Sequence, residues 1–240
     1  MVGAAATGDA VARARRLPGL KVGLHLVVTR GRAVLAPDDI PHLVDPAGRF
    51  PDGLARAGFR YFLVPGARRQ LEREIRAQFD AFRETGLPLD HVNVHNHMQL
   101  HPTVLGLILK VGHEYALTSV RLPYEPFLAS WRAAGDGLPV RFLSWLFLFP
   151  WAALMRFRLN RSNVLSNDYL FGMHDTGRMG KRRVLGILSH LPQGVSEVHF
   201  HPAGGPGGEL EALTSGEVAE VLGASGIESI RFGDLGRRGG

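Results

Sequence analysis

Four of the chain's eleven histidines fall within the segment HVNVHNHMQLHP at residues 91–102. Side chains alternate along a strand, so polar residues at every second position would share a face if the strand continued through them. These positions are His91, Asn93, His95 and His97. Several imidazoles on one face cannot all be satisfied cheaply away from solvent, because an unpaired buried polar group costs about 1–3 kcal/mol. The segment therefore indicates a metal site or acid–base chemistry, with hydrogen-bonded structural histidines as the alternative.

Two further strand-like segments carry histidines. His25 lies in GLHL, where the neighbouring leucines fall on the opposite face, so the imidazole needs a polar partner. In HFHP, His199 and His201 share a face and Pro202 ends the strand pattern. A single strand histidine is more often a hydrogen-bonded core residue than a ligand. Three histidine-bearing strand ends in one chain instead suggest a convergent site, most simply a divalent metal with a nearby histidine acid.

Composition narrows the kinds of site that are available. The chain has no cysteine, which excludes disulfides, cysteine-bound zinc and thiol nucleophiles. Any metal must therefore be held by histidine, aspartate, glutamate or carbonyl oxygen. The net charge is +6, but the arginines are spread along the whole chain without a basic stripe. Nucleic acid is therefore not expected as a partner.

Apolar runs of strand length alternate with helical patterns, which is typical of a parallel α/β sheet or barrel. The strand patterns cover residues 20–29, 89–95, 117–122 and 195–201. The helical patterns cover residues 66–85, 103–116, 181–190 and 209–223. Residues 30–65 and 124–140 are expected to be long loops, which on α/β scaffolds tend to carry the site. At 240 residues with 45% hydrophobic content, we expect a single domain over residues 1–240.

The longest apolar stretch is FLSWLFLFPWAALM at residues 142–155, between Arg141 and Arg156. It is shorter than the roughly 20 residues that a membrane-spanning helix needs. We expect a buried helix or a lid over a pocket. The alternative is a helix in a membrane interface, because its aromatic residues are bordered by arginines. The first residues lack a signal-peptide pattern, so a cytoplasmic location is expected, with peripheral contact at the inner face of the membrane as a variant.

Five segments in this order resemble the YdjC-like carbohydrate deacetylases: VGLHLVVTRG, IPHLVDPAGRF, TGLPLDHVNVHNHMQLHP, VRLPYEP and VSEVHFHPAG. More narrowly, they resemble the hopanoid-biosynthesis-associated HpnK subgroup. The resemblance runs over nearly the whole chain, and GLHL and the histidine block are its most specific parts. It implies a deformed (β/α) barrel of the polysaccharide-deacetylase-like type that hydrolyses the N-acetyl group of an acetylated amino sugar. In the subgroup the implied substrate is an N-acetylglucosaminyl hopanoid or a related glycolipid.

The resemblance also implies roles for individual residues. The family's two metal-binding histidines fall on His25 and His95, and the metal would be divalent, either magnesium or zinc. His201 matches a late histidine that would protonate the departing amine. Arg121 matches an arginine near the site and is expected to contact substrate, with His97 as a lesser candidate.

One part of the family pattern has no counterpart in this sequence. The family begins with a strand that ends in Asp-Asp-Phe-Gly, and Met1 corresponds to a point after the second strand. We therefore expect an N-terminally incomplete barrel that lacks the first strands and this carboxylate, most simply because the true start lies upstream. Neither Asp9 nor the pair Asp38 and Asp39 is expected to replace it. The alternative function is a catalytically impaired sugar- or lipid-binding relative, and homo-oligomerisation is left open.

Overall fold

The computed structural model describes residues 1–202 and 208–238. The chain divides into two compact units, each made of separate segments. Unit 1 comprises Met1–Arg121, Met155–Ser166 and Arg231–Gly240, and unit 2 comprises Leu122–Leu154 and Asn167–Ile230. The single domain over residues 1–240 stays a prediction.

Unit 1 is built on two parallel strands, β1 (Val22–Leu26) and β2 (Leu89–Val94). Leu24 and Leu26 are buried on one face of β1, and His25 lies on the other, as the alternation predicted. The register places His25 beside Asn93 of β2. Isolated parallel bridges continue the arrangement from Val92 to Val120 and from Ser119 to Leu165. The strand predicted at residues 117–122 is therefore present only as single bridges.

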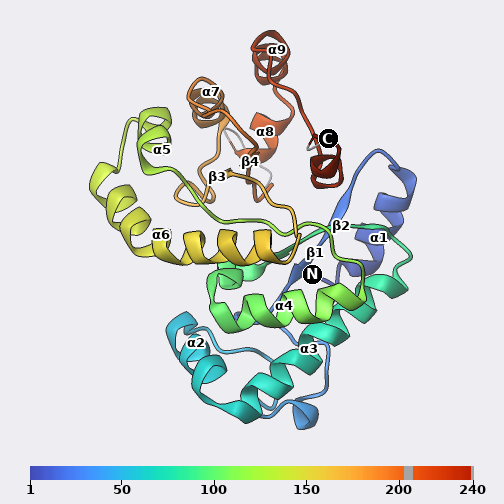
Figure 1. Cartoon of the computed structure of the whole chain (residues 1–240). Coiled ribbons are helices and arrows are strands. Elements are labelled where there is room, and N and C mark those ends of the chain that lie inside the picture. Colours follow the sequence, from blue (N-terminus) through green and yellow to red (C-terminus); the bar gives the residue numbers. More distant parts are fainter. Residues whose placement is uncertain (203–207, 239–240) are drawn as a thin grey trace. The chain divides into compact units, whose positions relative to one another are not determined.

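The helices of unit 1 follow the apolar spacing of the sequence. They are α1 (Thr7–Arg16), η1 (Pro37–Asp39), α2 (Leu54–Leu63), α3 (Pro65–Glu84), η2 (His95–Leu100), α4 (Pro102–Glu114) and η3 (Phe232–Arg238). In α3, Leu71, Ile75 and Phe79 recur every four residues and are buried. Pro65 begins this helix, and Gly86 follows its end with a left-handed backbone, φ 69°. α4 packs along α3 (Figure 1).

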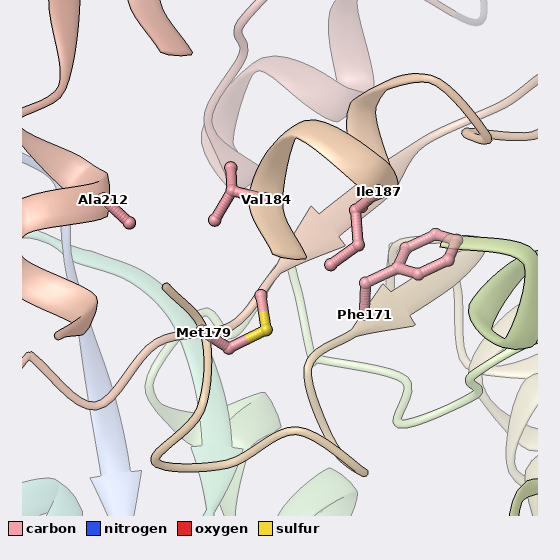
Figure 2. Close-up of a cluster of buried hydrophobic side chains, with 5 residues drawn as sticks. All are labelled: Phe171, Met179, Val184, Ile187 and Ala212. Carbon is pink, nitrogen blue, oxygen red and sulfur yellow. The ribbon is translucent and has the colours of Figure 1, made fainter. Parts of the chain in front are cut away.

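Unit 2 contains a second pair of parallel strands and several short helices. They are α5 (Phe127–Ala134), most of α6 (Leu138–Arg161), β3 (Tyr169–Phe171), α7 (Lys181–Leu188), β4 (Ser196–Val198), α8 (Glu209–Leu213) and α9 (Gly216–Ala224). Figure 2 shows the apolar cluster that joins them: Phe171, Met179, Val184, Ile187 and Ala212. Helices α5 and α7 approach closely at Gly186, where an added Cβ would lie 2.3 Å from the carbonyl oxygen of Ala133.

Several sequence expectations need correction. The predicted loops at residues 30–65 and 124–140 contain η1, α2 and α5. The predicted helix at residues 209–223 is two helices, because the Ser215 hydroxyl accepts a hydrogen bond from the Val218 N–H and starts a new helix there. The mixed helix and sheet character is confirmed. Among the described residues, the named strands form two separate two-stranded sheets, and the deformed barrel stays a prediction.

The expected burial of residues 142–155 is wrong for one face of the helix that they form. α6 extends over 24 residues, and its outward side chains are exposed, including Leu143 (62%) and Phe147 (72%). Its inner face contributes Ala152 and Met155 to the buried apolar residues. The helix is apolar on both faces, so burial of one face leaves the other exposed to solvent. By length and composition alone it could cross a membrane, and 17% of its most apolar window is buried.

Candidate functional site

The structure brings two of the predicted site histidines together in unit 1. Nε2 of His25, on β1, lies 3.4 Å from Nδ1 of His95, the first residue after β2. The two rings meet edge to face, with centroids 5.5 Å apart. Parallel pairing of β1 with β2 sets this proximity, because both strands end at the same edge. Their metal-binding role stays a prediction.

The separation of the two nitrogens fits a shared metal ion. Two imidazole nitrogens, each about 2.0–2.1 Å from a tetrahedral ion, lie about 3.3–3.4 Å apart. Across residues 1–202 and 208–238, no third histidine, aspartate or glutamate joins the pair to form a metal-binding group. The remaining coordination positions would be filled by water, by substrate or by a ligand outside the described residues.

The surroundings of His25 favour its neutral form. Burial lowers its pKa to about 4, from an ordinary value of 6.5. A hydrogen bond with Asn93 opposes this decrease, and positive charge on His95 and Arg121 adds to it. The imidazole is therefore neutral near pH 7, which is the form that binds a metal ion.

This pKa predicts a loss of stability in acid. The unfolded chain binds a proton at His25 below about pH 6.5, and the folded chain binds it only near pH 4. The unfolded state is therefore favoured as pH falls through this window, by about 3 kcal/mol at pH 4. Denaturant unfolding at pH 7 and pH 4, with a chelator present, should show that His25→Gln loses less stability in acid than the wild type by this amount. Equal losses in the two proteins would contradict the prediction.

Hydrogen bonds around the pair involve Asn93 and His91, which the strand alternation placed on one face, and Asp90, to which the sequence patterns gave no role. The Asn93 side chain is buried between His25 and His91: Oδ1 contacts Nδ1 of His25, and Nδ2 lies 3.2 Å from Nε2 of His91. Nδ1 of His91 lies 3.0 Å from a carboxylate oxygen of Asp90. The alternation along residues 91–95 was the available signal, since it places His91 and Asn93 on one face.

The strand does not continue through His97, so the shared face predicted on that condition does not reach this residue. β2 ends at Val94, and η2 follows with Asn96 and His97 in the left-handed region, at φ 54° and 55°. This change of backbone conformation ends the strand alternation before His97. Arg121 is buried in unit 1, where its backbone N–H donates to the carbonyl of Val92. Its positive charge helps to lower the pKa of His25. Its substrate contact stays a prediction.

His201 belongs to unit 2, where β4 ends at Val198 and the HFHP segment follows. Its backbone N–H donates to the carboxylate of Glu209, and its exposed ring meets that of His199 edge to face at 4.4 Å. The predicted strand over residues 195–201 is therefore shorter than expected. The role of His201 as the acid stays a prediction.

Comparison with known proteins identifies a family. A family model described as YdjC-like protein matches residues 1–224. A carbohydrate deacetylase of Brevibacillus brevis is 39% identical over 115 residues, which are 48% of this chain and 43% of that protein. The chain thus matches less than half of that relative's length. A carbohydrate deacetylase of mouse is 30% identical over 262 aligned positions, covering 95% of this chain and 82% of the mouse protein.

A solved structure supports the fold. The chain resembles the crystal structure of an Enterococcus faecalis protein thought to cleave cellobiose phosphate, with a TM-score of 0.65 over 95% of this chain and 82% of that one. The two sequences are 20% identical. At that level of identity, the likeness concerns the fold alone.

Proposed function

The chain belongs to the YdjC-like protein family, and from this membership we propose that it is a carbohydrate deacetylase. The reaction is hydrolysis of an N-acetyl group on an amino sugar: water adds to the amide carbonyl, the C–N bond breaks, and acetate and a free amine leave. The observation that carries the proposal is the 3.4 Å separation of Nε2 of His25 and Nδ1 of His95. Relatives named carbohydrate deacetylase from bacteria and from mouse support it.

The histidine pair gives this chemistry a location. His25 and His95 would hold a divalent ion, magnesium or zinc, through the two facing nitrogens. When bound, such an ion supplies Lewis acidity that polarises the acetyl carbonyl and makes water a better nucleophile. The low pKa of His25 keeps its imidazole neutral and available as a ligand near pH 7.

Other residues would act on the substrate and on the leaving group. His201 is exposed after β4, and its imidazole would transfer a proton to the departing amine. Arg121 carries a permanent charge in unit 1 that could hold a sugar hydroxyl or the acetyl oxygen. His97 remains a lesser candidate for substrate contact.

Acetate release tests the proposal. The protein is incubated with an N-acetylglucosaminyl glycolipid and with added zinc or magnesium, and acetate and free amine are counted together. Equal amounts of acetate and amine, lost on chelation, are the expected result. Substrate binding without release of acetate would contradict the proposal and favour a catalytically impaired sugar- or lipid-binding relative.

The proposed substrate is more specifically a glycolipid, such as an N-acetylglucosaminyl hopanoid. α6 supports this, because its outward face offers Val140, Leu143, Phe147 and Leu154 as a continuous apolar surface. These positions are spaced by three, four and seven residues, so they lie on one side of the helix. We define them as the α6 apolar face.

The charged residues of α6 favour an anionic lipid surface as the binding partner of the α6 apolar face. The helix has no aspartate or glutamate, and Arg156, Arg158 and Arg161 follow the apolar face at its C-terminal end. An apolar helix face bordered by arginines suits a membrane interface with anionic headgroups. The protein would then work as a peripheral protein on the inner face of the membrane.

Loss of this apolar face should weaken binding to lipid. The double variant Leu143→Gln with Phe147→Gln removes two exposed apolar side chains, each worth about 1.5–3 kcal/mol if fully buried in lipid. Because insertion is partial, we expect binding to phosphatidylglycerol vesicles to fall about tenfold to hundredfold. Vesicle sedimentation measures it. Trp145 is unsuitable for this test because it packs against Phe127 and Phe142.

A matched control is available on α2, where Phe59 and Leu63 are also exposed. Phe59→Gln with Leu63→Gln makes a similar chemical change outside α6 and should leave vesicle binding unchanged. Equal losses in both double variants would contradict the assignment to α6. Wild-type self-association through α6, without vesicle binding, would show that a second copy covers this face instead.

A further inference from the structure

A chain of hydrogen bonds runs through unit 1 from Asp90 to the candidate metal pair. A carboxylate oxygen of Asp90 lies 3.0 Å from Nδ1 of His91, and Nε2 of His91 lies 3.2 Å from Nδ2 of Asn93. Oδ1 of Asn93 contacts Nδ1 of His25, and Nε2 of His25 faces His95. His91, Asn93 and His25 therefore each lie between two neighbours in this chain of contacts.

The donors and acceptors along this chain can be assigned in only one direction. A carboxylate only accepts, so Nδ1 of His91 carries a proton, and Nε2 of His91 accepts because the Asn93 amide nitrogen that faces it can only donate. The Asn93 amide must then donate from Nδ2 to His91, which turns its oxygen toward His25. That oxygen accepts from Nδ1–H of His25. Nε2 of His25 is left with a lone pair, pointing toward His95.

The packing around His91 holds this arrangement in place. Phe232 stacks on the His91 ring with centroids 4.3 Å apart, and Gly233 N–H donates to the second oxygen of Asp90 at 3.1 Å. Across the sheet, Gly23 leaves space for the imidazole, since an added Cβ would lie 2.5 Å from the His91 ring. Both oxygens of Asp90 are thus engaged, and the His91 ring is held between β1 and the segment that begins at Arg231.

We propose that Asp90, His91 and Asn93 are positioning residues that fix the tautomer of His25, so that its Nε2 presents a lone pair to a divalent metal ion. Outer partners of this kind orient metal-binding histidines. The inference rests on the proposed function for the use of the metal, but it concerns residues outside the ligand pair. It also explains why the histidine block begins two residues before Asn93.

Asp90→Asn is the informative change because it keeps the shape of the side chain and replaces one accepting carboxylate oxygen with a donating NH2 group. The single amide oxygen cannot serve both Gly233 and His91, so the amide group faces His91 and reverses the donors and acceptors along the chain. Asp80→Asn is the matched control, since Asp80 accepts hydrogen bonds from Arg83 and Tyr115, which take no part in this chain of contacts. Asn93→Asp keeps an acceptor for His25 and should preserve its tautomer.

Two measurements test the positioning. In the metal-free protein, ¹⁵N–¹H spectra of the imidazoles should show His25 protonated at Nδ1 in the wild type and in Asn93→Asp, and shifted toward Nε2 in Asp90→Asn. Zinc titration by calorimetry should show affinity about 10–100-fold weaker in Asp90→Asn, and unchanged in Asp80→Asn. Thermal unfolding of each variant separates this effect from a loss of fold.

The outcomes separate the positioning from the metal site. Two results would overturn the positioning role proposed for Asp90, His91 and Asn93. One is a wild-type His25 protonated at Nε2, and the other is equal zinc affinity in Asp90→Asn and the wild type. The expected tautomers together with no zinc binding would support the positioning and overturn the proposed metal centre. The double variant Asp90→Asn with Asn93→Leu also removes the oxygen that accepts from His25. It should resemble Asp90→Asn alone in its imidazole spectra and in its zinc affinity.

Discussion

Replacing either His25 or His95 with alanine is expected to abolish tight metal binding and to lower kcat/KM for deacetylation by at least about a thousandfold. The facing nitrogens are the two ligand candidates that the structure brings together, and removal of one leaves a single imidazole. A bound metal ion contributes several kcal/mol of transition-state stabilisation, and each 1.36 kcal/mol corresponds to a tenfold change in rate. Acetate release and zinc calorimetry on the same preparations measure both effects.

The control for this prediction is His113→Ala. His113 is exposed near the end of α4, so the substitution removes an imidazole without touching the pair. Its activity and zinc affinity should match those of the wild type. Retention of full activity by His95→Ala, with the fold intact, would exclude the pair as the catalytic metal site.

The largest effect on stability is expected at Arg141, which is 2% exposed in unit 2. Its guanidinium donates to both carboxylate oxygens of Asp175 at 2.8 and 3.0 Å, and to the hydroxyl of Ser130 at 2.6 Å. The carboxylate of Glu125 lies 3.6 Å away and also accepts from the backbone N–H of Met173. This network joins α5, the start of α6 and the segment after β3.

Arg141→Met should therefore destabilise unit 2 by about 3 kcal/mol, because it leaves buried carboxylates without their main cation. Arg183 lies 3.4 Å from Asp175 and limits the loss. Arg141→Lys should restore part of the stability, since it keeps the charge without the forked geometry. The chain's three tryptophans, Trp131, Trp145 and Trp151, all lie in unit 2, so their fluorescence during denaturant unfolding reports on this unit.

Arg132→Met on α5 is the matched control, because Arg132 is exposed and the substitution should change stability by no more than about 0.5 kcal/mol. A loss below about 1 kcal/mol in Arg141→Met would mean that the network contributes little to the stability of unit 2.

Strand alternation was enough to predict that His25 faces away from its neighbouring leucines and needs a polar partner. The faces of residues 22–26 and 91–94 follow from period-two spacing, but the register that places Asn93 beside His25 comes from the structure. The spacing of α3 was equally informative, because its apolar residues recur every four positions. These features depend on local periodicity, which sequence alone contains.

Features that depend on tertiary contacts could not be predicted. The sequence does not show that the strand ends at Val94, because nothing in the alternating pattern marks the left-handed conformations that Asn96 and His97 adopt in the structure. Apolar composition likewise could not show which face of α6 is covered. The roles of Asp90 and Gly23 emerge only from their contacts with the His91 ring.

X-ray diffraction at the zinc absorption edge, on crystals of the zinc-loaded protein, tests whether the histidine pair holds a metal ion. One strong anomalous peak is expected between Nε2 of His25 and Nδ1 of His95, and it should disappear in His25→Ala. A peak held by other residues, or none at this pair under saturating zinc, would contradict the metal-dependent deacetylase centre proposed for this chain.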